Sequence, residues 1–289
     1  MEIVALMIGL IGAFLAYLQW YHPRSPKALI ISATTRCATL DRVLETKVLR
    51  VGFFHFPPLI DYDETATSVL ATGLYAEILN RLAIKEGLRI EWCPLKLSEA
   101  VRSVTQHQID CYACIMKSDV RYRECDFVGL LHSISVIGIV RKTGQSVISL
   151  SDLRNKRHIK VAVCQGEIGH QIASDTLKIP RQRLVELDTS DITQIISQVR
   201  DGHASVALAD ALSCKRMMKI PGAETEFELV FTNSSILTVP NGYMIAKDEG
   251  KFSDWFDRGI LGAYADIPEE DRGDRELLLE VGHSIVRLV

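Results

Sequence analysis

Hydrophobic and polar residues alternate along the chain with two different periods, which predict two kinds of element. Short apolar runs at 48–53 and 109–116 are typical of buried strands. Residues 74–83 carry apolar side chains at helical spacing, and Gly87 ends the pattern. Strands and helices follow one another in this way through the first half of the chain. This order predicts a parallel sheet that is covered by helices.

The same alternation begins again near Ser151 and predicts a second α/β lobe. Its expected strands and helices cover residues 159–164, 169–177, 184–187, 191–199 and 205–210. We expect the two lobes to be joined near residues 136–142. The first lobe would then comprise residues 40–140, and the second would comprise residues 141–234.

An uncharged apolar run at 3–18 is followed by aromatic residues and predicts a membrane-spanning helix. Only Glu2 precedes the run, and no convincing small-residue cleavage site follows it. We therefore expect an uncleaved transmembrane anchor at 1–22, not a cleaved signal peptide, with a linker at 23–39. Small residues at every fourth position of the run would let a helix of an integral-membrane partner approach closely.

The sequence features that bear on the orientation of this anchor in the membrane disagree. Arg24, Lys27 and Arg36 follow the apolar run, and this positive charge favours a cytoplasmic main domain. Seven cysteines, an odd number, favour the same side because exported proteins tend to pair their cysteines or lack them. A family resemblance described below favours the periplasm.

The composition is that of a globular protein, with 47% hydrophobic and 24% charged residues in a chain of 289. This length is enough for two lobes with cores of their own. A net charge of −3 and the lack of a nucleic-acid-binding motif give no reason to expect a nucleic-acid partner. Cys111 and Cys114 form a C-x-x-C, but no second pair stands at zinc spacing, so we expect no metal and no cofactor.

Polar residues that can bind a small ion follow several of the expected strands. Ser118 and Arg121 follow the strand at 109–116, and Gly166 and Asp210 stand at strand ends in the second lobe. A ligand of such a sheet lies outside the carboxyl ends of its strands. The Arg121 guanidinium matches a carboxylate with two parallel hydrogen bonds. Asp210 would either bind the ligand or cap the helix that follows it.

Several short motifs appear in a characteristic order along most of the chain, from about residue 39 to residue 261. They are Leu49–Gly52, Phe56-Pro57-Pro58, Gly73–Ile78, Ser118-x-x-Arg121, Asp126-Phe127, Ser151–Leu153, Gln165-Gly166, Ala209-Asp210 and Asn241–Ala246. In this order the sequence resembles the two-lobed solute-binding proteins (family 3) of bacterial amino-acid ABC transporters. The resemblance implies an α/β periplasmic-binding-protein-like (type II) fold, in which residues 235–289 return to complete the first lobe.

The resemblance also implies roles for individual residues in a ligand site between the lobes. Arg121, with Ser118 beside it, would bind the carboxylate of an amino-acid-like ligand. Asp210 would take the ligand ammonium group, and Phe56 would stack against the ligand body. The remaining contacts would come from Cys114, Met116, Gly166, Glu167 and Ile168.

The loop after Gly166 departs from the family pattern, which commonly has small hydroxyl residues where Glu167 and Ile168 stand. A desolvated carboxylate side chain would repel a bound carboxylate by several kcal/mol. Three explanations are open at this point. Glu167 points outward, or the ligand carries an extra positive charge, or the pocket no longer binds amino acids.

These observations and the resemblance predict a membrane-anchored binding protein that captures a small amino-acid-like ligand between two lobes for transport and catalyses no reaction. It would be a single-pass protein of the cell inner membrane with a periplasmic domain. One alternative is a sensor or accessory subunit of a larger membrane complex. The other is a dehydratase-like enzyme, which would need a general acid in the cleft, either Glu167 or His55.

Overall fold

The computed structural model describes residues 38–63, 69–143, 149–189, 191–232, 236–269 and 272. The expected anchor at 1–22 and nearly all of the expected linker at 23–39 lie outside these residues. Across the ranges described, no helix combines the length and the apolar character that a membrane crossing requires.

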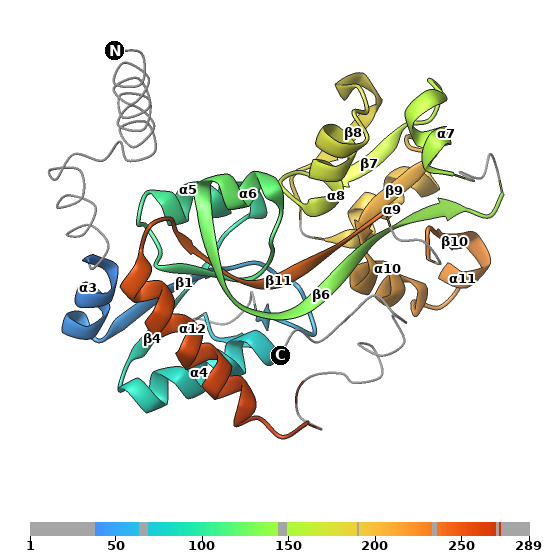
Figure 1. Cartoon of the computed structure of the whole chain (residues 1–289). Coiled ribbons are helices and arrows are strands. Elements are labelled where there is room, and N and C mark those ends of the chain that lie inside the picture. The colour runs from blue at the N-terminus through green and yellow to red at the C-terminus, as the bar shows by residue number, and fades with distance from the viewer. Residues whose placement is uncertain are drawn as a thin grey trace, which may run out of the picture.

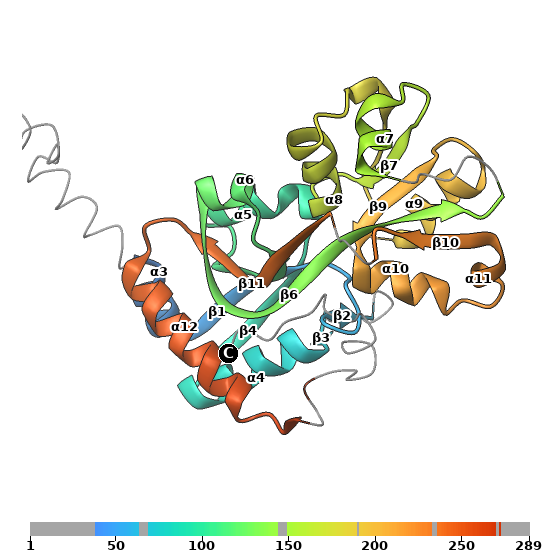
Figure 2. The same cartoon turned by 45° about the vertical axis from the view of Figure 1, so that its right-hand side comes forward.

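Figures 1 and 2 show two α/β lobes side by side, with two long strands running between them. These are β6 (Cys125–Arg141) and β11 (Leu237–Ala246). The strands of the main sheet follow the order β4-β1-β5-β11-β6-β9-β7-β8, and β10 also pairs with β6. The outer strands pair in parallel within each lobe, whereas β6 and β11 pair antiparallel with their neighbours. The two-lobed α/β fold predicted from the sequence is confirmed.

The first lobe is built on a group of parallel strands. Its strands are β1 (Val48–Phe53), β4 (Arg89–Pro94) and β5 (Cys111–Met116), with a small separate sheet of β2 (Asp61–Tyr62) and β3 (Ala71–Thr72). Its helices are α3 (Ala38–Thr46), α4 (Leu74–Glu86), a 3-10 turn at Leu97–Glu99, α5 (Ala100–Thr105), α6 (Asp119–Glu124) and α12 (Gly250–Ala265). Helix α4 ends as predicted, because Gly87 adopts the left-handed conformation that closes a helix.

The second lobe repeats this arrangement. Its strands are β7 (Val161–Cys164), β8 (Leu184–Leu187), β9 (Val206–Asp210) and β10 (Phe227–Val230). Its helices are α7 (Leu150–Asn155), α8 (Ile168–Gln171), a π turn at Ile172–Thr176, a 3-10 turn at Arg181–Arg183, α9 (Ile192–Arg200), α10 (Ala211–Met218) and α11 (Ala223–Glu226). The single helix expected at 169–177 is thus divided between α8 and the π turn.

The two lobes are joined by the strands β6 and β11 and not by a loop. Val136 of β6 lies opposite Leu237 of β11 on one side and opposite Asp210 of β9 on the other. Ile134 and the apolar residues at 136–140 are buried, so the crossing lies within the core. This continuity sets Asp210 next to the crossing, at the boundary between the two lobes.

Candidate ligand site between the lobes

The carboxyl ends of strands from both lobes meet at one place. Strand β5 ends at Met116 in the first lobe, and β7 and β9 end at Cys164 and Asp210 in the second. The segments that follow these strands bring together Arg121, Glu167 and Asp210, all of which are buried. Polar residues that the sequence places at strand ends therefore lie close together in the fold.

Arg121 lies in the first lobe and reaches the second. The Ser118 hydroxyl caps helix α6 by accepting a hydrogen bond from the Arg121 main-chain N–H at 3.3 Å. The Arg121 side chain donates from Nη1 to the Met116 carbonyl at 2.6 Å and from Nη2 to the Gly166 carbonyl at 2.5 Å. Burial lowers the pKa of Arg121 to about 10, so the guanidinium is still charged at neutral pH.

The lobes touch each other closely around this contact. Gly166 has a φ of +81°, and a Cβ added there would lie 2.8 Å from the Ser98 main-chain nitrogen of the first lobe. Lys96 forms an ion pair with Asp188, and Arg216 donates a hydrogen bond to the Pro57 carbonyl across the same boundary. The structure is therefore that of closed lobes.

Two carboxyl side chains face each other inside the closed cleft. Glu167 is 8% exposed and Asp210 is 2% exposed. The main-chain N–H and the carboxyl group of Asp210 both hydrogen-bond to the Glu167 carboxyl. Burial and the neighbouring Asp210 raise the pKa of Glu167 to about 8, and burial also raises the pKa of Asp210. The pair accordingly holds a proton near neutral pH, since two carboxylates in contact do not ionise together readily.

Glu167 and Asp210 still have hydrogen-bonding capacity that points to a ligand. Glu167 Oε2 is buried and has no hydrogen-bond partner. Asp210 accepts a hydrogen bond from the Ser213 main-chain N–H at 2.8 Å, so it also caps helix α10. The possibility that Glu167 points outward is thereby excluded, and both roles considered for Asp210 are compatible with its position.

The two carboxyl groups line a cavity of about 20 Å³, which is room for a single water molecule. The rest of its lining is largely apolar and comes from Phe54, Phe56, Leu97, Cys164, Ile192, Ile195 and Ser213. The rings of Phe54 and Phe56 stack with their centroids 5.3 Å apart. Phe56 thus lies beside Glu167 and Asp210 in the wall of this cavity. Phe54 was not predicted, although its place directly after β1, at a strand's carboxyl end, is a signal for it.

The other predicted site residues occupy different positions. Met116 and Gly166 contribute the carbonyl groups that accept from Arg121. Cys114 is buried in β5, where its sulfur accepts a long hydrogen bond from Asn241 and burial raises its pKa. Ser118 and Ile168 line a separate groove, together with Gln171 and residues 237–240.

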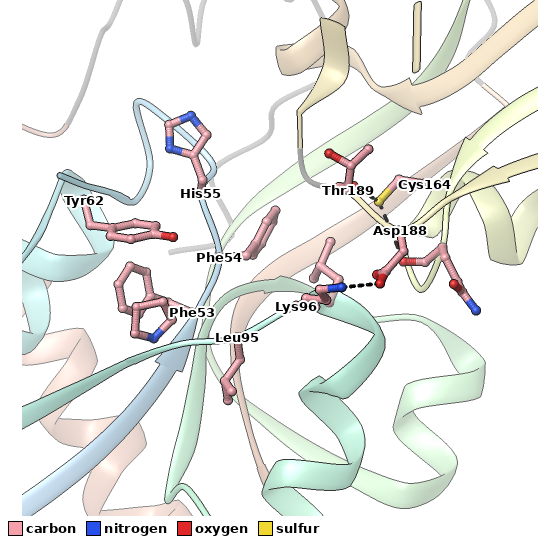
Figure 3. Close-up of a pocket in the computed structure, with 12 residues that line it drawn as sticks. Phe53, Phe54, His55, Tyr62, Leu95, Lys96, Cys164, Asp188 and Thr189 are labelled. Carbon is pink, nitrogen blue, oxygen red and sulfur yellow. Dashed lines mark hydrogen bonds and ion pairs between the residues drawn. The ribbon is translucent and has the colours of Figure 1, made fainter. Parts of the chain in front are cut away.

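A larger cavity of about 270 Å³ opens beside the small one (Figure 3). The two share Phe54, Leu97 and Cys164 in their walls. In Figure 3 aromatic side chains of the first lobe lie on one side, and Asp188 and Thr189 of the second lobe lie on the other. The remaining lining comes from Phe53, His55, Tyr62, Pro94, Leu95, Lys96 and Gln165.

His55 differs from Glu167 in its surroundings. Its Nδ1 pairs with the Asp61 carboxylate at 2.7 Å, and its side chain is 42% exposed. It lines the larger cavity but not the small one. Of the two general acids considered from the sequence, only Glu167 therefore faces the centre of the cleft.

Comparison with solved structures places this fold among known proteins. The solute receptor for L-cysteine of Neisseria gonorrhoeae matches with a TM-score of 0.65 and 16% identity over 78% of this chain and 88% of that chain. The histidine-bound substrate-binding protein of an ABC uptake transporter from Streptococcus pneumoniae matches with a TM-score of 0.65 and 12% identity over 84% and 94%. This chain has the two-lobed fold of the amino-acid-binding proteins of ABC transporters.

The same binding-protein fold also occurs in a histidine kinase sensor domain with similarity to periplasmic binding proteins. That domain matches with a TM-score of 0.63 and 19% identity over 75% of this chain and 92% of that chain. No family model matches the sequence, and no curated protein matches it either.

Proposed function

We propose that this protein captures a small amino-acid-like solute between its two lobes for transport. The observation that carries the proposal is the buried set of Arg121, Glu167 and Asp210, which meets at strand ends of both lobes. Of this set, Glu167 Oε2 is buried without a hydrogen-bond partner, and a bound solute would supply one. The binding-protein fold supports the same function.

Binding requires the lobes to separate, because the cavity between Glu167 and Asp210 is too small for an amino acid. Opening breaks the hydrogen bond from Arg121 to Gly166 and the ion pair from Lys96 to Asp188. A solute then enters, and hinge closure surrounds it with groups of both lobes. The closed form is the one that an ABC transporter would accept.

The proposed setting is the cell inner membrane, with an anchor at 1–22, the two lobes in the periplasm and a membrane-embedded permease as partner. The binding-protein fold supports a site outside the cytoplasm. Labelling of single cysteines with a membrane-impermeant maleimide in intact cells tests the orientation. Reaction at a surface cysteine introduced by Glu224→Cys is expected, whereas protection until the cells are lysed would refute the periplasmic setting.

Binding without catalysis is part of the proposal. A dehydratase would use Glu167 as its general acid, since burial and Asp210 keep the carboxyl protonated at neutral pH. The purified protein is expected to leave a prephenate-like substrate unchanged. Turnover that Glu167→Gln abolishes would establish the enzyme instead.

A sensor or accessory subunit is the second candidate, and the match to a histidine kinase sensor domain favours it. A sensor uses the same lobe closure but passes it to a partner within the membrane. Purification of the full chain in mild detergent distinguishes the two functions. A permease and its ATPase are expected to accompany a transport protein, and a kinase or another signalling protein would accompany a sensor.

Calorimetric titration with a panel of amino acids and related amines tests the central proposal. At least one compound is expected to bind, and Arg121→Ala is expected to abolish the binding because the lobes lose a contact between them. Arg123→Ala is the matched control, since Arg123 is exposed on the same helix α6. Circular dichroism shows whether each variant folds. The proposal fails if no compound of the panel binds.

A further inference from the structure

The charges of the cleft allow the chemical class of the solute to be narrowed, on the basis of the function proposed above. We propose that the solute is a small organic amine with an apolar body and no α-carboxylate, and that its ammonium group lies between Glu167 and Asp210. The argument rests on the position of Arg121, on the carboxyl pair and on the two neighbouring cavities.

Arg121 is not placed to receive a carboxylate from a ligand. Its Nη1 and Nη2 already donate to two main-chain carbonyl groups, and its side chain does not line the cavity between the carboxyl groups. Each of these nitrogens keeps one further N–H, so these two bonds alone do not exclude a carboxylate. The position of the guanidinium does: Arg121 lines neither this cavity nor the larger one beside it, so a carboxylate on a solute held in them would not reach its N–H groups.

The carboxyl pair is instead placed to receive a cation. Arg121 carries one positive charge, and Glu167 and Asp210 together carry one negative charge while they share a proton. An ammonium group that replaces this proton keeps the site neutral. It also supplies an N–H donor to Glu167 Oε2, which has none in the structure. A zwitterionic amino acid would add a carboxylate in a place where two acids already stand.

The apolar body of the solute fits the larger cavity next to the pair. That cavity has a volume of about 270 Å³ and shares the walls formed by Phe54, Leu97 and Cys164 with the smaller one. The rings of Phe53, Phe54 and Tyr62 and the side chain of Leu95 form an apolar wall, whereas His55, Lys96, Gln165, Asp188 and Thr189 make the rest of the lining polar. The stacked rings of Phe54 and Phe56 also lie beside the ammonium position, where cation–π attraction adds to the binding.

Matched pairs of compounds test this inference, because each pair differs only in the α-carboxylate. The pairs are phenethylamine with phenylalanine, tyramine with tyrosine, and isoamylamine with leucine. In calorimetric titrations of the full chain, we expect at least one amine to bind ten times more tightly than its amino acid, or better. Glu167→Gln and Asp210→Asn should each lower the affinity for that amine at least tenfold, because each removes a negative charge.

Glu224→Gln is the matched control, since Glu224 is exposed on α11 of the same lobe and should leave the affinity unchanged. Thermal melting shows whether each variant folds. Tighter binding of the amino acids would overturn the inference and leave the proposed function in place. If neither member of any pair binds, the result would count against the inference and against the proposed function. Amine binding that neither Glu167→Gln nor Asp210→Asn changes would overturn the placement of the ammonium group.

Discussion

At the scale of single residues, Glu167 decides the chemistry of the cleft. An ordinary glutamate has a pKa near 4.5, and burial together with Asp210 raises the pKa of Glu167 to about 8. The folded protein therefore keeps a proton on this side chain over a range of pH in which the unfolded chain has lost it. Such a group stabilises the fold least at high pH.

The free energy of unfolding is accordingly expected to fall as the pH rises from about 5 to about 8. One proton bound only by the folded state gives a slope of about 1.4 kcal/mol per pH unit. Chemical denaturation of the wild type and of Glu167→Gln at several pH values isolates this contribution. The variant should lose most of the slope, whereas Glu224→Gln should retain it. Equal slopes in the wild type and Glu167→Gln would show that Glu167 is ionised in the fold.

Amine binding should depend on pH for the same reason. The groups that face Glu167 are Asp210, Arg121, Cys164 and Cys214. Burial raises the pKa of both thiols, so they stay neutral, and Arg121 stays charged. An ammonium group must then displace the Glu167 proton, and affinity should rise up to tenfold per unit between pH 6 and pH 8. Calorimetry in two buffers of different ionisation enthalpy should detect up to one released proton, and none in Glu167→Gln.

Sequence reasoning identified some site residues more fully than others. Arg121 and Asp210 could be found because they are charged and follow apolar runs. The hydrogen-bond partners of Arg121 could not be predicted, because they are main-chain carbonyl groups, which every residue has. The sequence also could not predict that the Glu167 side chain points into the cleft, since this direction depends on how the second lobe closes against the first.

At the scale of elements, the alternation of apolar runs predicted most strands closely, and β8 was predicted with its observed bounds. The joint between the lobes was harder to interpret. Residues 134–140 contain no proline, and their nearly continuous apolar character is that of a fully buried strand as much as of a connection. The π turn at Ile172–Thr176 has no signature in the pattern, because it adds one residue to a turn of an apparently regular helix.

Helix α6 is short, and its start determines where Arg121 points. Ser118→Ala removes the hydroxyl that accepts from the Arg121 main-chain N–H. The loss of such a cap is expected to lower the free energy of unfolding by about 1 kcal/mol. It should also weaken solute binding, because the guanidinium loses its fixed approach to Gly166. Ser118→Asn, which can cap a helix, should restore both properties, and denaturant titration with calorimetry measures them. Equal losses in both variants would show that the hydroxyl has another role.

At the scale of the whole molecule, closure depends on how closely the main chain of one lobe approaches the main chain of the other. A Cβ at Gly166 would lie 2.8 Å from Ser98 N, whereas Gly202 has nothing within 4 Å of such an atom. Both glycines have a similar positive φ, +81° and +77°, so alanine strains the backbone alike at the two positions. The difference between the two variants therefore reports on contact between the lobes.

Gly166→Ala is expected to favour the open form and Gly202→Ala to leave the lobes as they are. Small-angle X-ray scattering should give a larger radius of gyration for Gly166→Ala alone. Its affinity for the solute should fall at least tenfold relative to Gly202→Ala, since part of the binding energy is then used to force closure. Identical scattering from both variants would mean that the loop can move without opening the cleft.

The two strands that cross between the lobes have a mechanical consequence. Because β6 and β11 are paired side by side through the crossing, a twist of one lobe against the other would shear their hydrogen bonds. A bend across the pair would leave those bonds in register. The pairing is therefore expected to restrict opening and closing to a bend about one axis across β6 and β11. The membrane partner proposed above would then need to sense only one distance, the gap between the lobe tips.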